Sequence, residues 1–200
     1  MVFSGIYALI DPAQRAALPY VEALLAGGIR LFQIRAKAGI APDLFAAILE
    51  RAHAREALVI VNDNVTLGAL ADGVHLGQED AAALDLAGLR ARLGHRVIGL
   101  SCGTPAEARA VPIGLADYLG VGPIFATGSK GDAGAPIGAS GVRAVVEATS
   151  LPVAAIGGIT LARVPRVRET GAAMAAVISA LETASDAGAA ARAFLAAWTA

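Results

Sequence analysis

Short apolar runs alternate with longer amphipathic, alanine-rich stretches along the whole chain. The runs have the length of buried strands, about 4–8 residues, and the stretches between them have the length of helices. The predicted strands cover residues 6–10, 30–36, 58–62, 73–76, 97–101, 117–121, 152–156 and 173–178. The predicted helices cover residues 12–26, 42–56, 64–70, 80–93, 104–112, 138–149, 161–170 and 184–198. This alternation of strand and helix predicts a single (β/α)8 TIM barrel over residues 1–200.

Residues at the helix boundaries agree with this division. Asp11 precedes Pro12 and Thr104 precedes Pro105, as at helix starts, while Gly94 marks a helix end. An open, doubly wound sheet is the competing architecture. Such a sheet normally carries a glycine-rich phosphate-binding turn after its first strand, and residues 11–13 (Asp-Pro-Ala) do not form one.

The second predicted strand is polar along one face. It reads Arg-Leu-Phe-Gln-Ile-Arg-Ala-Lys over residues 30–37. Side chains alternate between faces of a strand, so Gln33, Arg35 and Lys37 share one face and the apolar residues share the other. Burying unpaired charges is costly, so a polar pocket for an anion inside the sheet explains this pattern. A solvated edge strand with one wet face is the alternative.

Composition and charge exclude several classes of protein. The chain has 200 residues, 56% of them hydrophobic, which suffices for one domain with a sizeable core. A formal net charge of −1 provides no field to attract nucleic acid. One cysteine, Cys102, excludes an internal disulfide and a CxxC metal site. We expect no signal peptide and no membrane span, and therefore a cytoplasmic protein.

Polar and glycine-rich segments follow the predicted strands. In a (β/α)8 barrel the active site lies on the loops at the C-terminal ends of the strands. The segments in those positions are residues 35–37, 62–64, 78–80, 101–103, 122–130, 157–160 and 178–179. We therefore expect them to converge on one face of the barrel.

Two carboxylates fall within this set. Asp63 and Asp80 would meet beside Asn62. Carboxylates that converge without histidine or cysteine suit a hard cation, and Mg²⁺ is the best match because it takes one or two carboxylates and completes its shell with water and phosphate. The alternative is that Asp63 and Asp80 only cap the helices that follow them.

Three further segments have phosphate-binding character. Residues 127–130 (Thr-Gly-Ser-Lys) supply hydroxyls, backbone N–H groups and an ammonium group. Residues 157–158 (Gly-Gly) and 178–179 (Ile-Ser) follow the seventh and eighth strands, a frequent phosphate site of this fold. Two anion sites and a metal predict a diphosphate on one substrate and a monophosphate on another.

The histidines and the cysteine lack the features of catalytic residues. His53 lies on a predicted helix and His95 follows a glycine, so both are expected on the surface. His75 lies inside a strand, which favours a packed or supporting role. Cys102 has no cationic neighbours in sequence to lower its thiol pKa, so we expect it to pack among small residues.

Six segments together resemble the thiamine phosphate synthase family, over residues 7–181. They are Gln-Ile-Arg-Ala-Lys (33–37), Val-Asn-Asp (61–63), Ala-Asp-Gly-Val-His-Leu-Gly-Gln-Glu-Asp (71–80), Ala-Asp-Tyr-Leu-Gly-Val-Gly-Pro-Ile-Phe (116–125), Ala-Ile-Gly-Gly-Ile-Thr (155–160) and Val-Ile-Ser-Ala (177–180). The resemblance implies a (β/α)8 barrel enzyme, a transferase. Its reaction joins 4-amino-2-methyl-5-hydroxymethylpyrimidine diphosphate to a thiazole phosphate, giving thiamine phosphate and diphosphate.

The resemblance also implies roles for individual residues. The pyrimidine diphosphate would be bound by Gln33, Arg35, Lys37, Asn62 and Ser101. The thiazole phosphate would be bound by Thr127, Gly128, Ser129, Gly158, Ile178 and Ser179. Asp63 and Asp80 would hold Mg²⁺, and Lys130 would contact the leaving diphosphate. The implied reaction is dissociative, so Arg35, Lys37 and Lys130 would act by stabilising negative charge, and no general base is needed.

Three departures from the family pattern bear on this interpretation. The usual Pro-Thr-x-Thr-Lys loop is Ala-Thr-Gly-Ser-Lys at 126–130, and the usual Ser-x-His-Thr is Ser-Cys-Gly-Thr at 101–104. The segment between Asp63 and Asp80 is about two residues short. The alternative functions are a thiazole tautomerase and a non-catalytic barrel that binds thiazole phosphate or a partner protein. The sequence leaves open whether the protein forms a homo-oligomer. Retention of Asp63, Asp80 and Lys130 favours the synthase.

Overall fold

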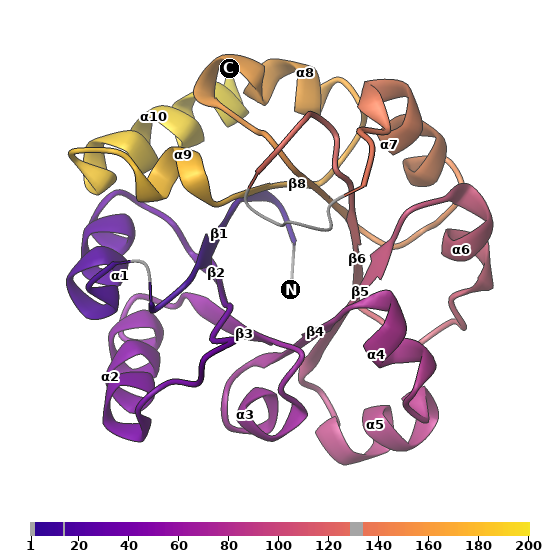
Figure 1. The fold of residues 1–200 in the computed structure, drawn as a ribbon, viewed down its shortest axis with the longest axis horizontal. Helices are drawn as coiled ribbons and strands as arrows, with labels where there is room; N and C mark the ends of the chain where they lie inside the picture. Colours follow the sequence, from indigo (N-terminus) through magenta and orange to yellow (C-terminus); the bar gives the residue numbers. More distant parts are fainter. Residues whose placement is uncertain (1–2, 14, 129–133) are drawn as a thin grey trace.

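The computed structural model describes residues 3–13, 15–128 and 134–200. Eight parallel strands form a closed barrel in the order β1 to β8, and helices surround it (Figure 1). The strands are β1 Gly5–Ile10, β2 Leu31–Ile34, β3 Leu58–Asn62, β4 Gly73–Leu76, β5 Val97–Cys102, β6 Tyr118–Val121, β7 Val153–Ile156 and β8 Met174–Val177. The predicted (β/α)8 fold is confirmed, and the open doubly wound sheet is excluded by the pairing of β8 with β1.

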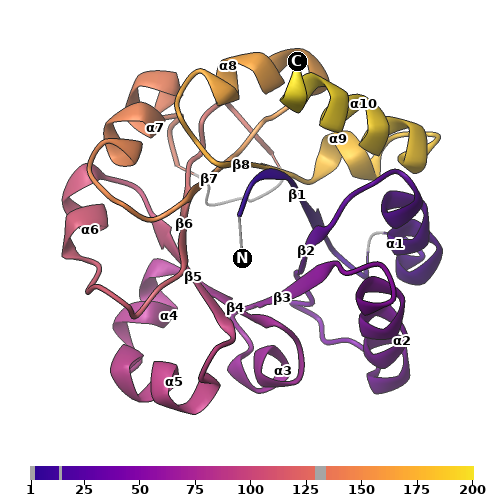
Figure 2. The same cartoon turned by 180° about the vertical axis from the view of Figure 1, so that it is seen from behind.

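The helices cover the outside of the barrel in both views (Figures 1 and 2). They are α1 Ala17–Ala26, α2 Pro42–His53, α3 Val65–Leu70, α4 Gln78–Ala82, α5 Leu86–Leu93, α6 Pro105–Ala110, α7 Gly138–Val146, α8 Val164–Arg168, α9 Ser179–Glu182 and α10 Ala187–Thr199, with a 3₁₀ turn η1 at Leu161–Arg163. In the part of the chain that the structure describes, no helix is both long and apolar enough to cross a membrane.

Two helix predictions were wrong in detail, and one helix was missed. The predicted helix 80–93 is two helices, because Asp85 accepts a hydrogen bond from Ala87 N (3.1 Å) and starts α5 anew. The first helix starts at Ala17 rather than residue 12, because Asp11 accepts from Ala13 N (2.9 Å) and forms a turn. The short helix α9 was not predicted.

The alternation of side chains divides the buried residues between two layers. Outward-facing residues of the strands pack beneath the helices in one large cluster. Inward-facing residues fill the barrel: Tyr7, Leu9, Leu31, Ile60, Val97, Tyr118, Ala154, Met174 and Ala176. Phe3 packs against this inner cluster, with its ring centroid 5.4 Å from that of Tyr118. The barrel is therefore filled with side chains near the N-terminal ends of the strands, and open space is left near their C-terminal ends.

Strand β2 places one of its three predicted polar residues inside the barrel. Gln33 is only 3% exposed and pairs in register with Leu9 and Ile60. The strand ends at Ile34, so the predicted strand 30–36 extended two residues too far and Arg35 lies beyond it. The two cations belong to the loop that follows. Because the barrel is closed, the alternative of a solvated edge strand is excluded.

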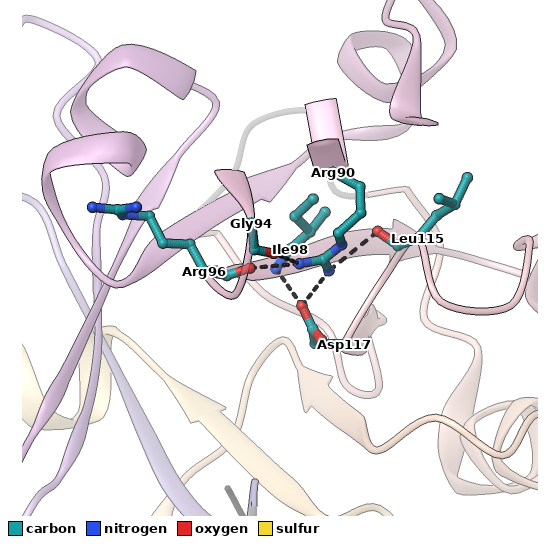
Figure 3. A network of polar contacts seen from close by, with 6 residues as sticks. All are labelled: Arg90, Gly94, Arg96, Ile98, Leu115 and Asp117. Atoms are coloured by element: carbon teal, nitrogen blue, oxygen red, sulfur yellow. Dashed lines mark hydrogen bonds and ion pairs between the residues drawn. The ribbon is translucent and has the colours of Figure 1, made fainter. Parts of the chain in front are cut away.

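At the end of the barrel where the strands begin, an ion pair and several hydrogen bonds link a helix to two strands (Figure 3). Arg90 on α5 donates to Asp117 Oδ2 at 2.6 Å, and the same oxygen accepts from Ile98 N at 2.7 Å. The guanidinium also donates to the carbonyls of Gly94, Arg96 and Leu115. One side chain thereby ties the end of α5 to the starts of β5 and β6.

Candidate active site

A cavity of about 520 Å³ opens where the strands end. The predicted site residues that line it are Gln33, Arg35, Lys37, Asn62, Asp63, Asp80, Ser101, Thr127, Gly158, Ile178 and Ser179. Gly128 lines an adjoining hollow together with Thr127, Gly158 and Ser179. Ser129 and Lys130 lie outside the described residues. The expected convergence on one face is thus confirmed for every predicted site residue that the structure describes.

Asp63 is held in an unusual backbone conformation at the mouth of this cavity. Its φ of 61° lies in the left-handed region, which costs free energy for a residue other than glycine. Its N–H donates to the carbonyl of His75 at 2.8 Å, and its carboxylate accepts from Asn62 Nδ2 and from Gly77 N at 3.4 Å. The conformation turns the carboxylate toward the end of β4 and the start of α4.

Asp63 and Asp80 form an electrostatically coupled pair. Partial loss of solvent raises the pKa of Asp63, the nearby Asp80 carboxylate raises it further, and Arg35 lowers it. Two carboxylates that repel each other are stabilised by a shared cation. The oxygen donors fit Mg²⁺, which needs only one or two protein carboxylates. No group of three or more His, Cys, Asp or Glu side chains suited to a metal occurs within residues 3–13, 15–128 and 134–200.

The capping alternative for the two aspartates is not supported. Helix α3 is capped by Asn64, whose side chain accepts from Leu67 N at 3.0 Å. Helix α4 begins after Gly77 without a side-chain cap, and Asp80 lies within its first turn. Neither Asp63 nor Asp80 therefore makes the capping hydrogen bond that would give it a purely structural role.

Arg35 and Lys37 supply positive charge at the cavity mouth. Arg35 is half-buried and Lys37 is exposed. Neither takes part in an ion pair within 4 Å among the described residues. Arg35 lowers the pKa of Asp63 and also that of His75 on β4, the strand adjacent to β3. Cations not neutralised by protein carboxylates are suited to binding an anionic ligand.

A chain of hydrogen bonds crosses the barrel along the floor of the cavity. Gln33 Nε2 donates to Tyr7 Oη (3.0 Å), which lies 2.8 Å from Tyr118 Oη. Tyr118 Oη lies 2.8 Å from His75 Nδ1, and His75 Nε2 lies 3.1 Å from Ser101 Oγ. Burial, and then the charge of Arg35, lowers the pKa of His75 to about 4. The expected packed role of His75 is confirmed, whereas Tyr7 and Tyr118 were missed.

The loops after β6 and β7 meet at the other side of the cavity. Gly157 and Gly158 have φ values of 104° and 62°, and a Cβ on Gly157 would lie 2.5 Å from Pro123 Cβ. This tight turn therefore requires glycine. Arg163, which was not predicted, donates to the carbonyl of Gly158 at 2.6 Å and lies 4.7 Å from the ring centroid of Phe125. It joins the two loops beside the smaller hollow.

Glu107 lies beside the position where the family pattern has histidine. Its carboxylate accepts from the N–H of Gly103 at 2.7 Å and from the amide of Gln78. Cys102 is buried and donates to the carbonyl of Thr104 at 3.2 Å, and burial raises its thiol pKa. The expected packing role of Cys102 is confirmed. His53 and His95 are both exposed, as expected.

Comparison with known proteins agrees with the motifs. A family model for thiamine monophosphate synthase matches residues 6–181. The chain is 46% identical over 200 residues to a thiamine-phosphate synthase of Herpetosiphon aurantiacus, covering 96% of this chain and 95% of that protein. It is 48% identical over 197 residues to a thiamine biosynthesis bifunctional protein of Symbiobacterium thermophilum, covering 96% of this chain and 40% of that protein.

A solved structure also supports the family resemblance. Thiamine phosphate pyrophosphorylase from Pyrococcus furiosus superposes with a TM-score of 0.87 at 31% identity, covering 98% of this chain and 96% of that chain. The resemblance inferred from the sequence motifs is confirmed by these matches. Because the family model covers most of the chain, the protein belongs to the thiamine monophosphate synthase family and is a transferase of thiamine biosynthesis.

Proposed function

We propose that the protein joins 4-amino-2-methyl-5-hydroxymethylpyrimidine diphosphate to a thiazole phosphate, releasing diphosphate and forming thiamine phosphate. The observation that carries this proposal is the cavity mouth, where the Asp63–Asp80 pair lies beside Arg35 and Lys37. Carboxylates for a cation, with free cations next to them, match the requirements of a diphosphate that leaves as an anion.

Asp63 and Asp80 would hold Mg²⁺, which supplies charge neutralisation to the departing diphosphate. Arg35 and Lys37 stabilise the same negative charge from the loop after β2. Asn62 and Ser101 bind the pyrimidine diphosphate from the ends of β3 and β5, and Gln33 contacts the ring from the cavity floor. Lys130 is assigned to the leaving diphosphate on the sequence motif alone.

The thiazole phosphate is assigned to the opposite side of the cavity. Thr127, Gly128, Gly158, Ile178 and Ser179 line that side or its adjoining hollow. Ser129 completes the set on the sequence motif. The thiazole nitrogen already has a lone pair, so these residues only need to hold it facing the pyrimidine methylene carbon.

The chemistry of the site does not favour a thiazole tautomerase. Moving a proton on a carboxythiazole phosphate needs a positioned base, most often histidine. His75 has hydrogen-bond partners for both ring nitrogens within the protein, and Gly103 replaces the family histidine. We therefore expect no acceleration of thiazole isomerisation by the enzyme.

The proposal is tested with purified protein, both substrates and Mg²⁺, with thiamine phosphate measured by chromatography. We expect product with Mg²⁺ and none in excess chelator. Full turnover in chelator would refute the metal assignment. Isomerisation of the thiazole followed by NMR, without thiamine phosphate formation when the pyrimidine diphosphate is added, would instead establish a tautomerase.

A further inference from the structure

The hydrogen-bonded chain along the cavity floor connects Gln33 with Ser101. Gln33 lies at one end and Ser101 at the other, and both line the cavity. Between them lie Tyr7, Tyr118 and His75, all at most 8% exposed. The chain therefore crosses the barrel interior, and Tyr7, Tyr118 and His75 line the floor of the same cavity as its two ends.

The barrel makes room for the rings of this chain by placing glycine next to them. A Cβ on Gly99 of β5 would overlap the ring of Tyr118, and a Cβ on Gly120 of β6 would lie 2.8 Å from His75 Cε1. Each of these two rings thus occupies space that a larger residue would fill, on the neighbouring strand β5 for Tyr118 and on β6, two strands away, for His75. The ring centroids of Tyr118 and His75 are 5.4 Å apart. Their positions are set by packing as well as by hydrogen bonding.

The direction of the hydrogen bonds follows from counting protons. Gln33 Nε2–H donates to Tyr7, so the single phenol proton of Tyr7 is available for Tyr118. The proton of Tyr118 then goes to His75 Nδ1, and His75 Nε2–H donates to Ser101. Burial keeps both phenols protonated by raising their pKa, and it keeps the imidazole neutral by lowering its pKa. Each hydrogen bond of the chain therefore contains one proton.

This direction determines what each end presents to a ligand. The Gln33 amide uses an N–H on Tyr7, so we infer that its carbonyl oxygen is left to accept a hydrogen bond from a ligand. The hydroxyl of Ser101 accepts from His75, so its own proton is available for an anion. An acceptor at one end and a donor at the other match a ligand with an amine on its ring and a phosphate oxygen on its tail.

We propose that Tyr7, Tyr118 and His75 are positioning residues, whose hydrogen-bond direction makes the site select a 4-aminopyrimidine diphosphate over its 4-oxo counterpart. This inference rests on the proposed function. An amine donates to the Gln33 carbonyl, whereas an oxo group would place a second acceptor against it and leave both unpaired. A site built to pair with one polar group discriminates strongly against a ligand that lacks it.

The substitution Tyr118→Phe is the sharpest test of this direction. It removes the acceptor for the Tyr7 proton, so Tyr7 is left to donate to the carbonyl of Gln33. The amide then turns over and presents its N–H₂ group to the cavity. The preference should therefore reverse toward the oxo ligand, which simple loss of packing would not produce. Tyr7→Phe removes the partner of Gln33 altogether, and the preference should fall to within about threefold of equal binding.

Binding of the 4-amino and 4-oxo forms of 2-methyl-5-hydroxymethylpyrimidine diphosphate is measured by calorimetry in Mg²⁺, without need of turnover. The matched control is Tyr20→Phe, because Tyr20 on α1 is also buried but its hydroxyl has no hydrogen-bond partner within the described residues. We expect the wild type and Tyr20→Phe to prefer the amino form by about tenfold or more. Thermal unfolding followed by circular dichroism shows which variants are folded.

The outcomes separate the two proposals. An unchanged preference in either folded variant, Tyr118→Phe or Tyr7→Phe, overturns the positioning role and leaves the proposed function intact. Equal binding of both ligands by the wild type overturns it as well. Failure of the wild type to bind either ligand refutes the proposed function together with this inference.

Discussion

The two ends of the barrel differ in whether their charged side chains have partners within the protein. Where the strands begin, Asp72 and Asp117 each precede a strand, and each accepts from a backbone N–H of the strand before it: Val59 N for Asp72 and Ile98 N for Asp117, both at 2.7 Å. His53 and Arg90 pair with these carboxylates at 3.0 and 2.6 Å. Where the strands end, Arg35 and Lys37 have no such partner among the described residues, and Asp63 faces another carboxylate.

The difference is the one expected between residues that stabilise the barrel and residues that bind a ligand. The aspartates at the strand starts accept from backbone groups and from side chains of neighbouring elements, so their contribution is present in the isolated protein. At the strand ends, like charges lie close together and Asp63 adopts a left-handed backbone conformation. Such an arrangement costs free energy until a ligand of the right charge binds.

The largest expected effect is the loss of activity when Asp63 is replaced. Asp63→Asn should lower kcat/KM by about 10²–10³ or more, the size found for loss of one preorganised charge-stabilising contact. The free energy of unfolding should not fall, because the substitution relieves the repulsion from Asp80. Asp117→Asn is the matched control at the opposite end, and it should lower stability while leaving kcat/KM within about twofold. Normal activity in a folded Asp63→Asn protein would contradict the comparison.

The next effect is a dependence of stability on pH through His75. In the unfolded chain His75 takes up a proton near its ordinary pKa of 6.5. In the folded protein its pKa is lowered to about 4, so the proton is taken up only at lower pH. Stability is therefore lost as the pH falls through this window, by about 3 kcal/mol in total. Urea unfolding at pH 7 and pH 4.5 measures the loss. His75→Asn should show a clearly smaller loss, and equal losses in both proteins would show that another group is responsible.

A smaller effect is expected at Arg90. Arg90→Met removes the hydrogen bonds that join α5 to the starts of β5 and β6 and should lower the free energy of unfolding by about 2 kcal/mol. The kcat/KM should stay unchanged, because the active site lies at the other end of the barrel. Arg92→Met, on the exposed side of the same helix, serves as the control. Chemical unfolding and steady-state kinetics on the same preparations decide between a structural and a catalytic role.

The smallest effect is expected at Arg163, a charged residue at the strand-end side that does have a protein partner. Arg163→Ala frees the Gly158 carbonyl and should raise the KM for thiazole phosphate about fivefold, with kcat little changed. Arg163→Lys should not restore the value, because an ammonium lacks the planar surface that stacks on Phe125. Arg166→Ala on α8 is the control. A lower kcat at constant KM would place Arg163 in the chemical step instead.

The local pattern of the sequence was sufficient for the strands and for most of the site. Short apolar runs between helical stretches placed all eight strands within about two residues of their observed bounds. Parallel strands in a barrel all end on one face, so position after a strand was enough to bring Asp63, Asp80 and Ser101 to one cavity. The split of residues 80–93 was missed, because a polar cap can divide a helical pattern without disturbing its period. Helix α9 was missed because it has only 4 residues and no side-chain cap to mark its start.

The sequence by itself determined the order of strands and helices and the chemistry at the strand ends, because both depend on periodicity and on neighbours along the chain. Only the tertiary structure decided which distant groups pair. Tyr7 and Tyr118 are separated by 111 positions and meet through closure of the barrel. Arg163 reaches Phe125 because β6 and β7 are neighbours. Such partners depend on strand register and side-chain packing across the barrel, which no local pattern encodes.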